Sequence, residues 1–434
     1  MTELLAMGIG GMIGGGIFSV LGMAVNISGH AAPMAFLLGS FVALAAGYSY
    51  VKLALGFQSD GASFTFLDRA FPEYPNVAGI AGWTVIVGYV GTLALYAYTF
   101  GVYGAHLLGD ADSPMVRMML SLGVLLFFLL INLQGVQSSG RTEVIIVFTK
   151  VILLGLFALA GTFSIKEDHL FPVFDQGVPS IFIAGAMIFV AFEGFQLITN
   201  AVLEAEKPKR NIPRGIYGSI LITSLIYFGV AIVAVGNLTP VQIESAKEYT
   251  LAVAAKPALG NTGAILVDLA ALLATSSAVN ATIFGASRMM ADMANENRMP
   301  QMFALRTKAK IPWVAIVFMT ALASGFTLLG SLETITLFSS LVFLLVSIAV
   351  SVANLKLRSF THSNLWLILL GIGLMLSTVT LLVIHLWSRD SIRFFWLLGF
   401  FATIAVLEIS FCWYRCRNDE EFHKKHRKQK VNHN

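Results

Sequence analysis

Charged residues are scarce in this chain. Asp, Glu, Lys and Arg make up 12% of its 434 residues and 57% are hydrophobic, whereas about 25% of the residues of a soluble domain are charged. Apolar runs of about 18 residues or more recur from end to end, and each is long enough to cross a bilayer as a helix. The composition excludes an ordinary soluble domain and predicts an all-α, polytopic membrane protein.

Cysteine is rarer still. Cys412 and Cys416 stand at the end of the last apolar run, where we expect free thiols and no disulfide framework.

The apolar runs also lack a pair of metal ligands or a nucleophile beside a base, so we expect no metal, no cofactor and no enzymatic activity. The start of the chain lacks the basic segment and cleavage site of a signal peptide. The net charge of +4 comes largely from the C-terminal tail, so it gives no reason to expect a nucleic-acid partner.

The apolar runs divide the chain into twelve predicted transmembrane spans. Their expected bounds are 4–28, 34–57, 78–108, 115–134, 141–163, 178–202, 214–236, 261–291, 311–330, 333–355, 364–387 and 393–414. Of the 28 Lys and Arg residues, 21 fall on one side of these spans, six on the other, and Lys150 within span five. The positive-inside rule then predicts a multi-pass protein of the cell (cytoplasmic) membrane with both termini in the cytoplasm.

The sequence predicts the structure or role of three connections between these spans. A short interfacial helix is expected within 61–71, between spans two and three. The segment 237–260 contains Pro240 and many small residues, which indicates a structured external loop. The segment from Lys207 to Arg214 is interpreted as a basic cytoplasmic loop that helps to set the topology.

Glycine gathers inside the first span. Six of the nine residues from Gly8 to Gly16 are glycine, although each costs a helix about 1 kcal/mol relative to alanine. Because a span has to satisfy its own backbone hydrogen bonds in lipid, we interpret the stretch as a helix broken at mid-membrane. The alternative is a small-residue packing face formed by Gly10 and Gly14. A phosphate-binding loop is disfavoured, because no Gly-Lys-Ser/Thr follows.

The sixth span is unusual as well, because Glu193 and Gly194 stand at its middle. Interrupted spans at matching places of two halves are typical of secondary transporters built from an inverted repeat. The expected divisions are a first five-helix repeat over 1–163, a second over 178–355, two further helices over 364–414 and a basic cytoplasmic tail over 415–434.

Broken helices expose unpaired N–H and C=O groups at their tips, which bind anions and cations respectively. Two breaks side by side suit a zwitterion. We expect its carboxylate at the N–H groups of Gly14 to Gly16, and its ammonium at carbonyls near Ile13 and from Val190 to Glu193. The predicted substrate-binding residues are Ile13, Gly14, Gly15, Gly16, Val190, Ala191, Phe192, Glu193 and Gly194. The Glu193 side chain is protonated, pairs with a cation, or lines the cavity; the sequence leaves these three open.

Lys150 is a basic residue near the middle of span five. A charged lysine at a helix centre costs about 3 kcal/mol on insertion scales. Either it tethers two helices permanently, or it alternates between charged and neutral forms during transport. Ser276 and Ser277 of span eight are polar groups that could accept a hydrogen bond from it.

Several segments carry a family resemblance. They are Gly14-Gly-Gly-Ile-Phe18, Gly61-Ala-Ser-Phe-Thr-Phe66, Phe192-Glu-Gly-Phe195, Pro208-Lys-Arg-Asn-Ile-Pro213, and Ser287 to Ala294 followed by Met299-Pro300. In this order they resemble motifs of the amino acid–polyamine–organocation superfamily, most closely its proton-coupled, ApcT-type amino acid transporters. In one respect the chain departs from the family, because Glu193 replaces an apolar residue common at that position.

The resemblance implies a leucine-transporter-type fold, with a 5+5 inverted repeat, two C-terminal helices and alternating access. It implies an amino acid substrate held by the backbone of helices one and six. It also implies that Lys150 stands where sodium-coupled relatives bind sodium, with its amine reaching carbonyls near Gly10 and the hydroxyls of Ser276 and Ser277.

The resulting prediction is proton-coupled symport of amino acids across the lipid bilayer, with an amino acid and protons as the small partners. One alternative is a proton-independent exchanger or exporter of amino acids or amines, in which Lys150 is structural. A membrane sensor that binds an amino acid without moving it is a weaker alternative, because the chain has no soluble output domain. A membrane-embedded enzyme ranks last.

Overall fold

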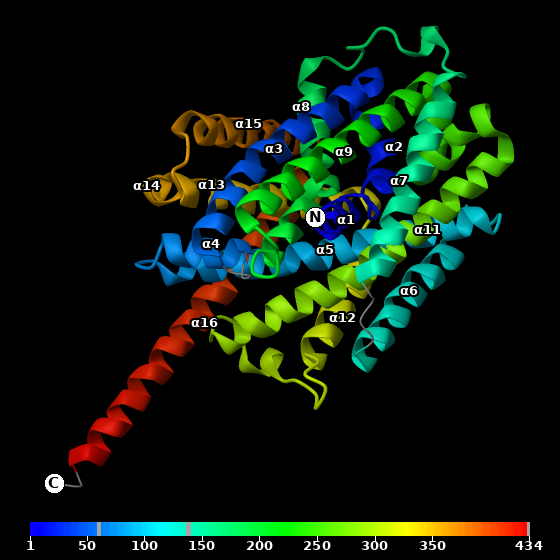
Figure 1. Ribbon diagram of the computed structural model, residues 1–434. Coiled ribbons are helices and arrows are strands. Elements are labelled where there is room, and N and C mark those ends of the chain that lie inside the picture. Colours follow the sequence, from blue (N-terminus) through cyan, green and yellow to red (C-terminus); the bar gives the residue numbers. More distant parts are fainter. Residues whose placement is uncertain (59–61, 136–139, 432–434) are drawn as a thin grey trace.

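The computed structural model describes residues 1–58, 62–135 and 140–431, and this part of the chain is helical with no strand (Figure 1). The α-helices are α1 (Thr2–Met12), α2 (Gly16–Ser28), α3 (Ala32–Phe57), α4 (Ala62–Ala70), α5 (Pro75–Leu107), α6 (Pro114–Gln134), α7 (Gly140–Thr162), α8 (Val178–Met187), α9 (Pro208–Asn237), α10 (Pro240–Ala246), α11 (Thr250–Asn295), α12 (Trp313–Leu329), α13 (Leu332–Lys356), α14 (Arg358–Thr361), α15 (Leu365–Arg389) and α16 (Ser391–Val431). The 3-10 helices are η1 (Gly29–Ala31), η2 (Glu167–His169), η3 (Phe189–Ala201), η4 (Lys247–Tyr249) and η5 (Gln301–Ala304).

Many of these helices are long and apolar enough to cross a membrane. Within the described residues nine helices qualify, and the bent pair α8 and η3 adds a tenth. The shorter α12 is also apolar, and residues 16–57, where we expect two spans to meet, form one apolar unit of 42 residues. The all-α, polytopic fold is confirmed, whereas the number of twelve spans stays a prediction.

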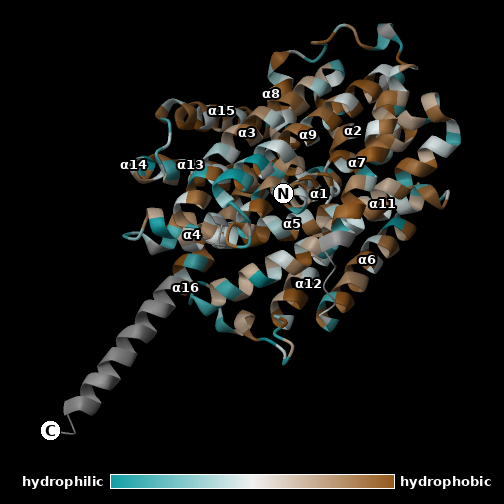
Figure 2. Cartoon of the chain, in the orientation of Figure 1, coloured by the Kyte–Doolittle hydropathy of each residue, from teal (hydrophilic) through white to brown (hydrophobic). Residues whose placement is uncertain are grey.

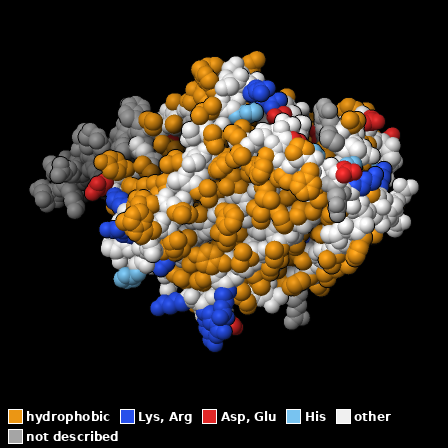
Figure 3. Space-filling model, turned by 90° about the horizontal axis from the view of Figure 1, so that it is seen from above, with side chains coloured by type: hydrophobic (Ala, Val, Ile, Leu, Met, Phe, Trp, Pro, Cys, Tyr) orange, Lys and Arg blue, Asp and Glu red, His pale blue; other side chains and the backbone are white. Residues whose placement is uncertain are grey.

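Hydrophobic residues run along most helices of the bundle (Figure 2). In the space-filling view, hydrophobic side chains cover the middle of the visible face, and Lys and Arg gather towards its margins (Figure 3). On α6, for example, Leu126, Phe127 and Leu130 are exposed. Such a surface is a liability in water and is what a helix presents to lipid.

The interior is built around α1, which begins at an exposed end and runs among other helices of the bundle (Figure 1). α1 packs against η3, α7 and α9, so the two interrupted spans touch each other. Around them, α5 packs against α11 and α13, and α3 against α9. These contacts place the mid-membrane glycines and Glu193 in the same region; the internal symmetry of a 5+5 repeat remains a prediction.

The connections agree with the sequence in two places. α4 is the short helix expected after span two, and α10, η4 and the first turns of α11 give structure to 237–260. Gly260 turns α11 with a φ of 62°, a left-handed conformation that glycine adopts without a steric penalty.

One connection differs from the prediction. The expected loop from Lys207 to Arg214 is the first part of α9, which begins at Pro208. A proline is well tolerated in the first helical turn, because its missing N–H would have no partner there. At the other end of the chain, α16 continues through the predicted tail as far as Val431. The side chains of Cys412 and Cys416 lie outside the described part.

Candidate functional site

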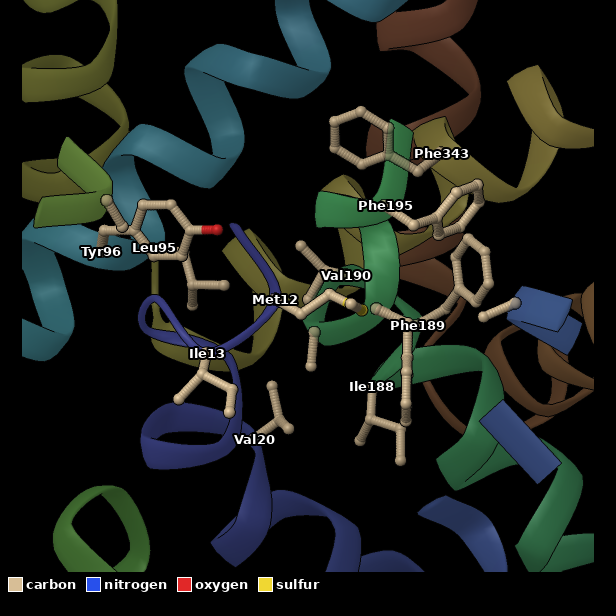
Figure 4. Packing of buried hydrophobic residues seen from close by; sticks show 14 of the residues in the cluster. Met12, Ile13, Val20, Leu95, Tyr96, Ile188, Phe189, Val190, Phe195 and Phe343 are labelled. Carbon is tan, nitrogen blue, oxygen red and sulfur yellow. The ribbon is translucent and has the colours of Figure 1, made fainter. Parts of the chain in front are cut away.

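The first span is interrupted between Met12, where α1 ends, and Gly16, where α2 begins. The three residues between them are buried. Tyr96 of α5 packs against this connection, and a Cβ atom added to Gly15 would lie 2.6 Å from Cδ1 of its ring. Any residue with a side chain would collide there, so glycine is needed for the close approach. Figure 4 shows the Tyr96 ring beside the connection.

The sixth span bends by 46° where α8 ends at Met187 and η3 begins at Phe189. η3 has 13 residues, which is long for a 3-10 helix. Ser340 of α13 holds the bend, because its hydroxyl accepts from Val190 N at 3.0 Å and donates to Met187 O at 2.5 Å. One side chain therefore satisfies two backbone groups that the bend leaves unpaired.

The two interruptions are in direct contact. A Cβ atom on Gly194 would lie 2.3 Å from the carbonyl carbon of Gly11, so only glycine lets the two backbones come this close. Tyr227 of α9 joins both breaks, since its Oη lies 2.6 Å from Met12 O and 3.1 Å from Ala191 O. The first and sixth spans thus meet at one place in the bundle, among buried hydrophobic side chains that include Met12, Ile13, Val190 and Phe195 (Figure 4).

The last four carbonyls of α1 all have a donor. A helix leaves these groups without a partner of its own, and here the donors come from the helix cap and from three other helices. Ile9 O accepts from Ile13 N, Gly10 O from Lys150 Nζ, Gly11 O from Tyr96 Oη and Met12 O from Tyr227 Oη. Carbonyls expected to receive a substrate ammonium near Ile13 are therefore occupied by the protein itself in this state.

Lys150 of α7 is 1% exposed, and the distance from its Nζ to Gly10 O is 3.1 Å. Ser276 and Ser277 make no hydrogen bond to it within the described chain. Their side chains instead line a cavity of about 500 Å³ between α7 and α11, which we call the vestibule and whose walls do not include Lys150. The contact with Gly10 agrees with the expectation, and the role of the four residues stays a prediction.

Glu193 of η3 is 6% exposed. Its Oε1 lies 3.0 Å from Thr92 Oγ1 of α5, and its Oε2 is buried with no hydrogen-bond partner among the described residues. Nearby Gln196 is 4% exposed, and its Nε2 also lacks a partner. Buried polar groups are hydrogen-bonded in the large majority of cases, so two unpaired groups in one place indicate a position for a ligand or water.

A small cavity lies where the two breaks meet. Its walls include Gly10, Gly11, Tyr96, Glu193, Gly194 and Ser277. This central cavity measures about 30 Å³, which is room for water and not for an amino acid. The spans have closed on the centre in the state that the structure describes.

The vestibule leads from the central cavity towards the face where the chain begins. The two spaces share Glu143 and Ser277 in their walls, among other residues, and Met7 near the start of α1 lines the vestibule. Towards the opposite face, Ile17 and Phe18 are fully buried. The centre is therefore better connected to the N-terminal face than to the opposite one.

Polar side chains tie the helices together near that opposite face. His106 of α5 and Asp268 of α11 lie 2.8 Å apart, and Arg117 of α6 bonds to Glu248 of η4 at 2.7 Å. The first pair joins α5 to α11, and the second joins α6 to η4. Asp268, one of the intramembrane acids of the sequence, thus has a structural partner.

The predicted substrate residues divide into three groups. Glu193 and Gly194 line the central cavity, whereas Gly14, Gly15 and Gly16 pack closely against Ala278, Tyr96 and Ala191. Ile13, Val190, Ala191 and Phe192 belong to the buried apolar core. The sequence missed Tyr96, Tyr227 and Ser340, because a tyrosine or a serine in an apolar span is not unusual enough to be singled out.

Residues 1–412 match the family model for amino acid permeases. The chain belongs to the amino acid permease family. It is 32% identical over 410 residues to an uncharacterized protein of Methanocaldococcus jannaschii, with 94% of each chain covered. It is 29% identical to the inner membrane transport protein YbaT of Escherichia coli (92% of this chain, 93% of the relative) and 27% identical to the branched-chain amino acid permease BcaP of Bacillus subtilis (82% and 80%).

This permease is accordingly a membrane transport protein and not an enzyme. Its family sets amino acids as the class of substrate. No group of three or more His, Cys, Asp or Glu side chains able to hold a metal ion occurs among the residues that the structure describes.

Proposed function

We propose that this permease is a proton-coupled amino acid transporter that works by alternating access, with Lys150 as the coupling residue. The substrate binds where the breaks of the first and sixth spans meet. The chain lies in the cell membrane with its N-terminal face, and hence the vestibule, towards the cytoplasm. The observation that carries the proposal is the bond from the buried Lys150 ammonium to the carbonyl of Gly10.

This bond couples charge to the position of α1. A protonated lysine is a cation held against the negative end of a helix, an arrangement that the helix dipole favours. When the lysine loses its proton, this attraction falls and the unpaired end of α1 is stabilised less. Protonation therefore biases α1 towards the position seen here, and deprotonation favours its release.

The proton gradient is large enough for the task. One charge that crosses a membrane potential of about 100 mV gains about 2.3 kcal/mol, and one unit of pH difference adds about 1.4 kcal/mol. Together they support an accumulation of several hundredfold, because about 1.4 kcal/mol corresponds to a factor of ten.

The test is uptake of labelled amino acids by liposomes that contain the purified permease. An inward proton gradient should drive accumulation with or without sodium, and collapse of the gradient by a protonophore should abolish it. Uptake that requires sodium and ignores the pH gradient would contradict proton coupling. Exchange of internal for external amino acid, with no accumulation when a proton gradient is imposed, would favour the exchanger instead.

A further inference from the structure

The feature that the coupling mechanism leaves unexplained is the carboxyl group of Glu193. It is buried at the meeting point of the two breaks, and Oε2 has no partner. No Lys or Arg of the described chain lines the central cavity. A carboxylate left in this place would be an uncompensated charge, which proteins avoid because its desolvation is very unfavourable.

The contact with Thr92 indicates how the empty protein avoids this charge. Thr92 Oγ1 lies 3.0 Å from Gly88 O and 3.0 Å from Glu193 Oε1. A hydroxyl has a single hydrogen, and the Gly88 carbonyl has none to give. Both contacts are full hydrogen bonds when the hydroxyl donates to Gly88 O and the carboxyl group, protonated at Oε1, donates to Thr92.

The groups around Glu193 supply no positive charge. The titratable side chains that face it are Tyr50 from α3 and Tyr89 and Tyr96 from α5, and Glu143 from α7 lies across the cavity. Three phenols and another acid add no cation. A cation therefore has to come with the ligand, and aromatic rings beside a carboxylate suit such a group.

The backbone leaves few other acceptors for a cation. The carbonyls of Gly10, Gly11, Met12 and Ala191 already accept from Lys150, Tyr96 and Tyr227. Within the described structure, Glu193 Oε2 is thus an acceptor of the central cavity that the protein does not use itself.

We propose that Glu193 carries a proton in the empty permease and exchanges this proton for a positively charged nitrogen of the substrate. In this step the O–H bond of the carboxylic acid breaks, the proton leaves to water in the vestibule, and the carboxylate pairs with an alkylammonium group. The site stays neutral before and after binding. The inference rests on the proposed transport function for the identity of the ligand, and it assigns to Glu193 a proton separate from that of Lys150.

An alkylammonium can come from two sources, namely the α-amino group of any amino acid or the side chain of a basic one. Three probes separate them: L-leucine offers the first, 1,5-diaminopentane offers alkylammonium groups without a carboxylate, and L-lysine offers both. Calorimetric titration of the purified permease in two buffers with different ionisation enthalpies counts the protons released on binding. We expect about one proton per bound probe, with release by L-leucine identifying the α-amino group.

Two variants assign the released proton. Glu193→Gln should bind the same probes at least about tenfold more weakly, because a charge-assisted bond is lost, and should release no proton at this site. Asp268→Asn is the control, since Asp268 is a buried carboxyl group that pairs with His106 and does not line the central cavity, and it should retain the release. Binding heats that do not depend on the buffer, or a Glu193→Gln variant that releases as many protons as the wild type, would overturn the proposal.

An infrared spectrum of the ligand-free permease at neutral pH tests the first half of the proposal without any ligand. The C=O stretch of a protonated carboxylic acid should be present in the wild type and missing in Glu193→Gln. Thr92→Val should shift this band without removing it, because the acid then loses a hydrogen-bond partner. If the wild type and Glu193→Gln have the same spectrum in this region, Glu193 is ionised and the proposal is wrong. Proton-driven uptake is measured separately: a proton that Glu193 gives up for each substrate molecule counts against symport, so uptake that ignores the proton gradient would contradict the proposed function and leave the result for Glu193 standing.

Discussion

The two interrupted spans are stabilised in different ways. At the end of α1, the last carbonyls accept from a lysine and two tyrosines that belong to three other helices. At the end of α8, one serine of α13 bonds to both sides of the bend. The first break thus depends on a group that can lose its charge, and the second on a neutral hydroxyl that cannot. Under the proposed mechanism, this difference predicts which break moves: α1 changes position with the charge of Lys150, and the bend between α8 and η3 stays as it is.

Lys150→Ala should have the largest effect on this comparison. Without the ammonium group, the position of α1 no longer depends on a proton, and uptake driven by a proton gradient should fall at least about tenfold, the value of a charge-assisted bond. Exchange of labelled for unlabelled substrate needs no net proton movement and should fall less. The readout is the ratio of the two rates in the same liposomes.

Lys52→Ala is the matched control for this experiment, because the Lys52 ammonium also donates to a backbone carbonyl, that of His362, at 3.0 Å. That bond lies at the protein surface, away from the breaks. If the ratio of proton-driven uptake to exchange is the same in both variants, the charge of Lys150 does not control the position of α1.

Gly194→Ala tests the place where the two breaks touch. Its new Cβ atom would lie 2.3 Å from the backbone of Gly11, so the spans have to separate, and we expect a loss of about 3 kcal/mol in stability, at the upper end for overpacking. Thermal unfolding in detergent measures the loss. Gly155→Ala of α7, where a Cβ atom meets nothing within 4 Å, should unfold at the wild-type temperature or above; a similar loss in both variants would refute the contact.

The sequence identified the residues that are energetically unfavourable in a transmembrane helix. Consecutive glycines, Glu193 and Lys150 each carry a penalty in an apolar span, and therefore stand out without a structure. The same reasoning located both interruptions and the polytopic helical fold. It could not identify Tyr227 or Ser340, because these side chains matter through hydrogen bonds to backbone groups that lie near them only in the folded chain.

The sequence could not predict where open space lies in the state that the structure describes. The N–H groups from Gly14 to Gly16 were the natural place for a substrate carboxylate, yet Tyr96 fills the space beside Gly15. The cavity lies one turn earlier, at Gly10 and Gly11. Side chains on other spans decide which side of a break is open, and no local pattern reports them.

Tyr227→Phe removes the donor that the two breaks share. Its single hydroxyl hydrogen is shared between Met12 O and Ala191 O, so both carbonyls lose their share of a donor, and we expect a destabilisation of about 2 kcal/mol. Tyr103→Phe removes one bond of the same kind, to Phe18 O at 2.9 Å, and should cause about half the loss. Thermal unfolding of the two variants side by side gives the comparison; equal losses would mean that Tyr227 bonds to only one of the breaks.

Ser340→Ala should have the smallest effect, because a neutral hydrogen bond contributes about 1 kcal/mol and the bend is also held by its packing. Ser351 lies three turns further along α13, is equally buried, and its hydroxyl has no hydrogen-bond partner among the described residues. Ser351→Ala therefore removes the same atom without removing a bond and should leave the unfolding temperature unchanged. If the second break is fixed, Ser340→Ala lowers stability slightly and leaves the ratio of proton-driven uptake to exchange as in the wild type. A change in that ratio comparable to the change in Lys150→Ala would show that the second break also moves with the proton, and the distinction between the two spans would be lost.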